Sequence, residues 1–290
     1  MDATDRSSLP RRPRSNSPRE PLPHDVSELP EIDPIFGQLL DAGLGEIPLE
    51  LDPDQRRAMV DHARLLLAWN AHINLSGLRA AEQIARGHVL DALIAVPALR
   101  ELTASSGRSA AGAVTLLDLG SGAGYPGLPL SIALPAGRTA LVDSIAKKAA
   151  FLDAAAGVVA AAVPRDIVTL AERAEDLADE PDQREGWQLV VARAVGSVAE
   201  VAELGLPLTS RDGQLVIWKR GADSAALGQE LEHARRICQA AGGTAPRVVL
   251  LDAAERVGLP GNCLVVIRKR RPTPDRYPRT TGERRRAALP

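Results

Sequence analysis

The chain has 290 residues, of which 45% are hydrophobic and 25% are charged, and its formal net charge is −2. This length and composition are typical of a folded protein with one large domain or two modest ones. No apolar run approaches the roughly 20 residues of a membrane-spanning helix, and the N-terminus lacks the apolar stretch of a secretory signal. The two cysteines, Cys238 and Cys263, have no metal-like spacing. We therefore expect a cytoplasmic protein with no membrane partner and no metal site.

The N-terminal part divides into a tail and a helical region. Residues 1–30 are rich in Pro, Ser and Arg and show no apolar periodicity, so we expect a disordered tail. Residues 31–110 follow as a helical region. After Asp52 and Pro53, apolar residues recur every three or four positions, which predicts an amphipathic helix with a cap at its start. A second helix is expected from His88, interrupted near Pro97, before a small-residue linker at 104–113.

Residues 111–270 form the predicted catalytic domain. Apolar runs typical of buried strands alternate there with helical stretches. Strands that are apolar on both faces and separated by helices indicate a mostly parallel sheet covered on both sides. The fold class is therefore α/β and Rossmann-like. The seven predicted strands are 113–119, 139–143, 166–170, 187–195, 213–218, 246–251 and 262–268.

Residues 271–290 form a predicted basic C-terminal tail. From Arg268 onward the chain has nine basic and two acidic residues, a net charge of +7, whereas the remainder carries −9. Such an end either contacts a polyanion or is solvated.

A glycine-rich loop follows the first predicted strand, in LLDLGSGAGYPGLPL. Its glycines, Gly120, Gly122, Gly124 and Gly127, would let the backbone approach a ligand closely. In open α/β sheets, ligands bind beyond the carboxyl ends of the strands. Part of the loop also matches the dinucleotide pattern G-x-G-x-x-G, so a dinucleotide and S-adenosylmethionine compete for this position.

Two acidic residues favour S-adenosylmethionine or an adenosine in general. Asp118 ends the first strand, where a carboxylate would repel a pyrophosphate but attract a cationic sulfonium and an ammonium group. Asp143 ends the second strand and is placed to accept the ribose hydroxyls of either ligand. Its alternative role is to cap the following helix, although Ser144 could serve instead.

The methyl acceptor is narrowed by two missing motifs. The fourth strand runs into ARAVGSVAE, without the Asn/Asp-Pro-Pro-aromatic loop typical of amino-group methylation, and neither cysteine is placed as a nucleophile. An acceptor that is already nucleophilic, such as guanine N7, requires no general base. Positioning alone can supply about 7–11 kcal/mol of the barrier. We therefore nominate no catalytic acid or base.

Several stretches together resemble the RsmG (GidB) family of bacterial 16S ribosomal RNA guanine-N7 methyltransferases. They are DLGSGAGYPGLPLSI, LVDSIAKKAAFL, ARAVGSVAE, a Trp-Lys-Arg-Gly turn at 218–221, and LVVIRK. The resemblance spans roughly residues 35–279. It implies a class I methyltransferase fold, S-adenosylmethionine as cofactor, and 16S rRNA or the small ribosomal subunit as partner.

The resemblance also implies particular site residues. Cofactor contacts carry over to Gly120, Tyr125, Ala174, Glu175 and Arg193, beside Asp118, Gly122 and Asp143 from the loop argument. For Glu175 the alternative is a solvated helix charge. Arg193 could instead bind RNA or a structural Asp, because an arginine in an apolar strand is seldom unpaired. Expected RNA contacts are Arg193, Lys219, Arg220, Arg268 and Lys269, whereas Trp218 is expected in the core.

Three other functions compete with this interpretation. A small-molecule methyltransferase would share the cofactor site but would not need the basic end. A NAD-dependent oxidoreductase would share the loop. A non-catalytic RNA-binding or assembly factor would bind subunits without a cofactor. We expect a monomer.

Overall fold

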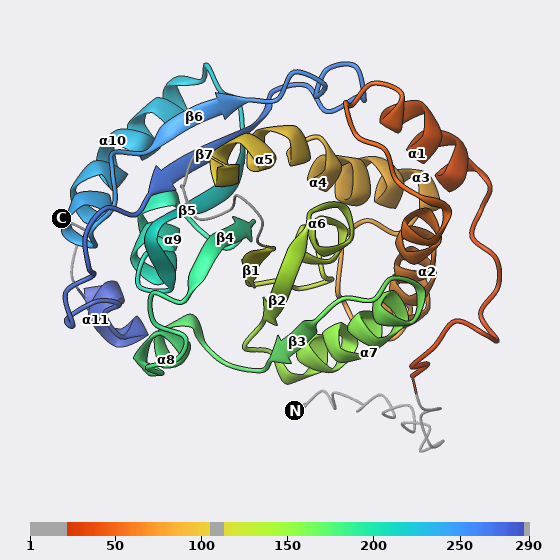
Figure 1. The fold of residues 1–290 in the computed structure, drawn as a ribbon, viewed down its shortest axis with the longest axis horizontal. Coiled ribbons are helices and arrows are strands. Elements are labelled where there is room, and N and C mark those ends of the chain that lie inside the picture. Colours follow the sequence, from red (N-terminus) through yellow and green to blue (C-terminus); the bar gives the residue numbers. More distant parts are fainter. Residues whose placement is uncertain (1–21, 105–112, 287–290) are drawn as a thin grey trace, which may run out of the picture.

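A computed structural model describes residues 22–104 and 113–286 (Figure 1). A seven-stranded sheet with strand order β3-β2-β1-β4-β5-β7-β6 runs through the molecule. β1 pairs in parallel with both β2 and β4, and only β7 runs antiparallel to its neighbours β5 and β6. The predicted mostly parallel sheet is confirmed. The strands are β1 (Val114–Leu119), β2 (Ala136–Val142), β3 (Ile167–Leu170), β4 (Trp187–Arg193), β5 (Thr209–Arg220), β6 (Arg247–Leu250) and β7 (Asn262–Arg268).

The strand order reverses at the centre of the sheet. The chain moves outward from β1 to β3 on one side and returns to begin β4 on the other side of β1. The ends of these strands are in register, since Leu119 at the end of β1 pairs with both Val142 and Ala192. The segments that follow β1, β2 and β4 therefore emerge side by side, where α/β proteins bind ligands.

One face of the sheet is covered by the N-terminal helices together with the helices after β1 and β2 (Figure 1). The predicted cap of α2 is confirmed, because the Asp52 carboxylate accepts a hydrogen bond from the Gln55 amide at 2.8 Å. The second predicted helix is a broken series with a π-helical turn, η1. These elements are α1 (Ile35–Leu44), α2 (Pro53–Asn70), α3 (Ala81–Ile84), η1 (Ala85–Leu90), α4 (Asp91–Leu93), α5 (Val96–Ala104), α6 (Gly127–Ala133) and α7 (Ala146–Ala162).

A second hydrophobic core lies on the opposite face, beneath the helices that follow β3, β4 and β5. The last helix of this side, α11, lies near α8 and α9 (Figure 1). In the part of the chain described, no helix combines the length and the apolar character needed to cross a membrane. The helices of this face are α8 (Ala174–Asp179), α9 (Val198–Gly205), α10 (Ala225–Ala240) and α11 (Thr281–Arg286).

The predicted disordered tail is wrong for its last nine residues. Residues 22–30 pack against α2, where the Trp69 indole donates to the Pro23 carbonyl at 2.7 Å and Arg64 Nε donates to the Pro30 carbonyl at 3.0 Å. Their apolar side chains, such as Leu22 and Val26, also contact the core. Residues 1–21 and most of the predicted linker lie outside the described residues.

Candidate functional site

A cavity of about 410 Å³ opens beyond the carboxyl ends of the central strands. Its volume lies in the range of roughly 300–1,000 Å³ that is typical of small-molecule sites. Four predicted cofactor residues line it, namely Gly120, Asp143, Ala174 and Glu175. We call this cavity the first pocket.

The glycine loop bends sharply around one side of this pocket. Gly120, Gly122 and Gly124 have φ values of +72°, +57° and +80°, a region that side chains seldom adopt. A Cβ on Gly120 would lie 2.7 Å from Val195 Cγ2, so this position has neither the backbone freedom nor the room for a larger residue.

Asp143 lines the first pocket but does not cap α7, whose N-cap residue Ile145 has no side-chain cap. Its Oδ1 accepts from the Ile145 amide at 2.9 Å, next to the start of α7, while Oδ2 accepts from the Gly122 amide at 3.1 Å. Lys148 Nζ lies 3.6 Å from Oδ2. The carboxylate thus lines the pocket and is oriented by its surroundings, whereas Gly122 contributes by holding Asp143 and does not line the pocket itself.

Asp118 does not line the first pocket, although its carboxylate was predicted to attract a sulfonium and an ammonium group there. Its side chain is fully buried, and Oδ2 accepts from the Gly127 amide at 2.9 Å, at the start of α6. Burial raises the pKa of Asp118 to about 6, although the bond from Gly127 lowers it. Asp118 therefore holds the loop through Oδ2 from inside the protein, whereas its Oδ1 is buried without a hydrogen-bond partner.

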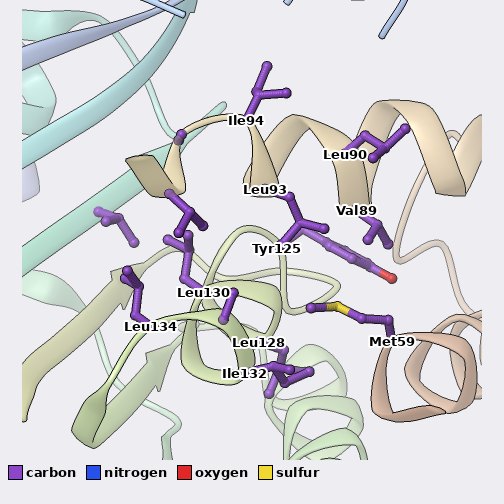
Figure 2. Close-up of a cluster of buried hydrophobic side chains, with 14 of the residues drawn as sticks. Met59, Val89, Leu90, Leu93, Ile94, Tyr125, Leu128, Leu130, Ile132 and Leu134 are labelled. Atoms are coloured by element: carbon purple, nitrogen blue, oxygen red, sulfur yellow. The ribbon is translucent and has the colours of Figure 1, made fainter. Parts of the chain in front are cut away.

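Tyr125 is also misplaced by the prediction, because its side chain points into the apolar cluster of Figure 2. The ring is 3% exposed and is stacked between His62 and His88, with 4.4 Å between ring centroids on either side. It lines neither pocket. His62 belongs to no motif of the sequence and was not predicted here; its Nε2 donates to the Ala123 carbonyl of the glycine loop at 2.9 Å.

Both histidines of this stack are neutral near pH 7. Burial lowers the pKa of His62 to about 4, and burial together with the nearby Arg193 lowers the pKa of His88 to about 3. The neutral His88 ring can therefore accept a hydrogen bond from Arg193 on Nδ1 at 2.7 Å, and its Nε2 donates to Ser76 Oγ at 2.7 Å.

Arg193 reaches a second, adjoining pocket of about 280 Å³. Its guanidinium donates to Asp91 Oδ2 at 2.7 Å and to the Gly87 carbonyl at 3.0 Å. Asp91 is fixed in turn by Asn262, whose amide nitrogen donates to Oδ1 at 2.7 Å. The Trp218 indole, buried as expected, donates to the Asp91 carbonyl at 3.0 Å. The sequence analysis did not assign Asn262 to the site.

Ala194 lies between the two pockets and lines both. Its φ of +58° is uncommon for a residue with a side chain and costs on the order of 1–3 kcal/mol. The strand β4 ends at Arg193, so this strained residue is the first one beyond the sheet.

Of the five predicted RNA contacts, Arg193, Lys219 and Arg220 lie at the second pocket and two do not. Lys219 and Arg220 line it. Lys219 pairs with Glu230 at 2.6 Å, and Arg220 Nε donates to Asn262 Oδ1 at 2.9 Å. Arg268 and Lys269, which were also expected to contact RNA, lie far from this pocket, because β7 is antiparallel and its last residues lie at the opposite ends of the neighbouring strands.

The environments of these two residues agree with that correction. Lys269 is fully buried, and its Nζ lies 2.7 Å from Glu185 Oε1, so it cannot contact RNA. Arg268 pairs with Asp212 at 3.0 Å. Because β7 is antiparallel, Arg268 at its end lies away from the site, whereas Asn262 at its start lies beside Arg220 and within the site.

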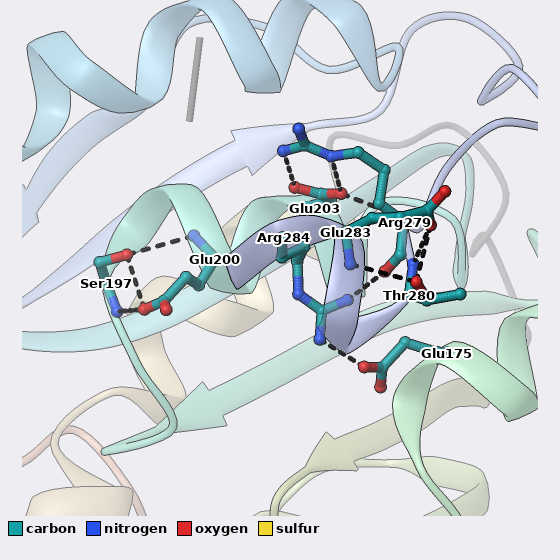
Figure 3. Close-up of polar contacts among 8 residues, drawn as sticks. All are labelled: Glu175, Ser197, Glu200, Glu203, Arg279, Thr280, Glu283 and Arg284. Atoms are coloured by element: carbon teal, nitrogen blue, oxygen red, sulfur yellow. Dashed lines mark hydrogen bonds and ion pairs between the residues drawn. The ribbon is translucent and has the colours of Figure 1, made fainter. Parts of the chain in front are cut away.

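Glu175 contacts the segment that was predicted as a basic tail (Figure 3). Thr281 Oγ1 donates to Glu175 Oε1 at 2.6 Å, and Arg284 pairs with the same oxygen. Thr281 and Arg284 line the first pocket, and neither was a predicted site residue. Among the described residues, no group of three or more His, Cys, Asp or Glu side chains could hold a metal ion.

Comparison with known proteins gives a consistent result. The family described as rRNA small subunit methyltransferase G (GidB) matches residues 55–257. The protein of that name from Roseiflexus sp. (strain RS-1) is 37% identical over 234 residues, covering 81% of this chain and 92% of the relative. The Lachnoclostridium phytofermentans protein of the same name is 32% identical, covering 83% and 92%.

Proposed function

The chain belongs to the GidB family of small-subunit rRNA methyltransferases, and on this premise we propose that it transfers the methyl group of S-adenosylmethionine to N7 of a guanine in 16S rRNA. The first pocket would hold the cofactor and the second pocket the guanine. The observation that best supports this assignment is that the two pockets adjoin each other. Both pockets share Ala194, at the strand ends where the sheet reverses its order.

The residues of the first pocket fit the cofactor chemically. Asp143 offers a carboxylate to the ribose hydroxyls, while the Ala174 backbone and the Glu175 side chain lie beyond β3, where they would meet the adenine. Gly120 lets the backbone of the loop approach the methionine part. When bound, the cofactor supplies a methyl group on a cationic sulfur.

The second pocket offers donors to an acceptor-rich base and to its phosphates. Guanine presents O6 and N7 as acceptors on one edge, and arginine is the residue most often found against that edge. Arg193 is held in place by Asp91, His88 and a backbone carbonyl. Lys219 and Arg220 at the rim suit phosphate contacts.

The reaction needs no proton acceptor, because the N7 lone pair is unprotonated at neutral pH. We assign no general acid or base in either pocket. The chain's residues would bind the two reactants, orient them and exclude water, and such positioning can contribute about 7–11 kcal/mol.

The protein is proposed to act as a cytoplasmic monomer. Both cysteines are free and buried, as suits a reducing compartment. Light scattering during size-exclusion chromatography should give the mass of one chain. A stable dimer would contradict the monomer without affecting the activity.

The proposed activity is tested by methyl incorporation. Small subunits from a strain without the modification should accept labelled methyl groups from S-adenosylmethionine, at a single N7-methylguanosine in the 16S rRNA. Arg193→Met should lower kcat/KM at least 100-fold, because it removes the guanidinium that is proposed to face the guanine. Arg211→Met, at an exposed position near the start of β5, is the matched control. Absence of label from both subunits and naked 16S rRNA would refute the proposal.

A further inference from the structure

The chain after β7 returns across the molecule to the cofactor edge of the sheet. β7 ends at Arg268, opposite the site, yet Thr281 and Arg284 line the first pocket. We refer to residues 277–286 as the C-terminal segment. Figure 3 shows its last part, α11, between α9 and Glu175 of α8.

A buried ion pair anchors this segment before α11 begins. The Arg279 guanidinium donates to both carboxylate oxygens of Glu203, at 2.8 and 2.7 Å, and the Arg279 amide donates to the same carboxylate at 3.0 Å. The Glu203 side chain is fully buried. Arg184 adds a bond of 3.1 Å to the Tyr277 carbonyl. Charge-assisted, bidentate bonds of this kind fix geometry well.

The helix itself starts with a reciprocal cap. Thr280 Oγ1 and the Thr280 amide both donate to Glu283 Oε2, at 2.7 and 2.9 Å, and the Glu283 amide donates back to Thr280 Oγ1 at 3.3 Å. This capping box, with the anchor directly before it, determines where α11 begins and which side chains face the first pocket.

Two side chains of α11 then hold Glu175. Thr281 and Arg284 are one turn apart on the helix, and both bind Glu175 Oε1. The Arg284 and Glu175 side chains are each only 14% exposed, although both line the first pocket. Burial alone would raise the pKa of Glu175, but the bonds from Thr281 and Arg284 hold it below its usual value, so the carboxylate is ionised.

We infer that the C-terminal segment is the outer wall of the cofactor site, with Arg284 as a positioning residue that orients Glu175 toward the adenosine. This inference depends on the proposed function, since it takes the first pocket to be the cofactor site. Basic residues of the C-terminal segment thus form intramolecular ion pairs and complete the cofactor site. The cofactor is enclosed only when α11 is docked.

The test compares affinities for S-adenosylhomocysteine by isothermal titration calorimetry. Arg284→Ala should weaken binding about tenfold, and so should deletion of residues 281–290, which keeps the Arg279–Glu203 anchor. Arg286→Ala is the matched control. Arg286 is an exposed arginine of the same helix, bonded to the Gly282 carbonyl, and the variant should bind within twofold of the wild type. Unchanged or tighter binding by the deletion variant would overturn the inference.

Glu175→Gln separates a positioning role from a general loss of folding. If Arg284 acts through Glu175, adding Arg284→Ala to Glu175→Gln should change the affinity by less than twofold. Two independent tenfold losses would contradict the positioning role. Arg279 stays intact in every variant, because its removal would leave the buried Glu203 carboxylate unpaired.

Proteolysis of the wild type gives an independent measurement. Residues 284–286 are three consecutive arginines, so trypsin cleaves there when α11 undocks. Saturating S-adenosylhomocysteine should slow this cleavage about tenfold, as followed by mass spectrometry, and an unchanged rate would count against the wall. If the wild type fails to bind S-adenosylhomocysteine at all, the proposed function fails too. If the wild type binds S-adenosylhomocysteine and the Arg284→Ala and deletion variants bind it equally well, the proposed function stands and this inference alone fails.

Discussion

Tyr125 and the two histidines that enclose it join the glycine loop to Arg193. His62 holds the loop through the Ala123 carbonyl, and His88 accepts from Arg193, with the tyrosine ring between them. The contact between His88 and Arg193 requires a neutral His88, because a protonated imidazole has no lone pair left to accept a hydrogen bond from the guanidinium. Burial guarantees that state at neutral pH.

The lowered pKa of His62 makes stability depend on pH in a definite direction. Between about 4 and 6.5, the unfolded chain binds a proton that the folded chain excludes, so the free energy of unfolding rises with pH. This contribution is complete above pH 6.5 and is lost as the pH falls toward 4. His88 acts in the same direction, whereas Asp118, with its raised pKa, opposes them below about pH 6.

We predict that His62→Phe reduces the loss of stability between pH 7.5 and pH 5.0 by up to about 2 kcal/mol, because phenylalanine keeps the stack but cannot bind a proton. Urea unfolding of both proteins at the two pH values measures this difference. His233→Phe, at an exposed position of α10, should leave the pH dependence as in the wild type. Equal losses in His62→Phe and wild type would show that His62 is not buried as a neutral ring.

At the scale of the elements, the direction of β7 decides which residues reach the site. Among the strands of the described residues, β7 alone runs antiparallel to its neighbours, so its first residue lies at the ligand-binding end of the strands and its last residue at the other end. Asn262 thus joins Arg220 to Asp91, and through Asp91 it orients Arg193.

Asn262→Ala is therefore predicted to lower kcat/KM for 16S rRNA methylation about tenfold, since it removes a buried hydrogen bond worth roughly 1–1.5 kcal/mol. Arg268 lies at the opposite end of the same strand, away from the pockets. The kcat/KM of the control variant Arg268→Ala should therefore stay within twofold of the wild type. Initial rates on small subunits distinguish them. An equal loss of kcat/KM in both variants would contradict the proposed docking of the RNA at the pocket end of β7.

Much of the fold could be predicted because buried strands and amphipathic helices are recorded locally in the sequence. The apolar runs identified all seven strands, and Asp52 with Pro53 identified the start of α2. Strand direction is not recorded in this way. An apolar run looks the same in either orientation, which is why Asn262 was missed. Arg268 and Lys269 were expected to contact RNA because they begin the basic end of the chain, and the run gives no sign that they lie away from the pockets.

Side-chain direction and distant partners were the other limits. Asp118 was expected to face a ligand, but its partner is an amide nine residues later, a contact that only the folded loop creates. The arginines of the basic end resembled a solvated tail because their acidic partners, Glu203 and Glu175, are more than 70 residues away in sequence. Tyr125, carried over from the family resemblance, lies in the stack and does not line the first pocket.

At the scale of the whole molecule, the sheet, with helices on both of its faces (Figure 1), separates two hydrophobic cores. The two pockets open beyond the carboxyl ends of its central strands. The charge asymmetry of the sequence is largely removed by folding. Basic residues of the C-terminal end pair with Asp212, Glu185, Glu203 and Glu175, which belong to the acidic remainder of the chain. The charges left at the ligand edge, rather than the net charge of any segment, should therefore determine how rRNA docks.

The strained Ala194 has a consequence for how the two reactants affect each other. Two ligands that share one peptide are not energetically independent, because any rotation about φ or ψ that suits the first alters the enclosure of the second. Thermodynamic reciprocity then requires that rRNA and the ligand of the first pocket change each other's dissociation constant by the same factor. Titrating S-adenosylhomocysteine with and without bound small subunits should reveal that factor, and Ala194→Gly, which relaxes the peptide, should bring it closer to one.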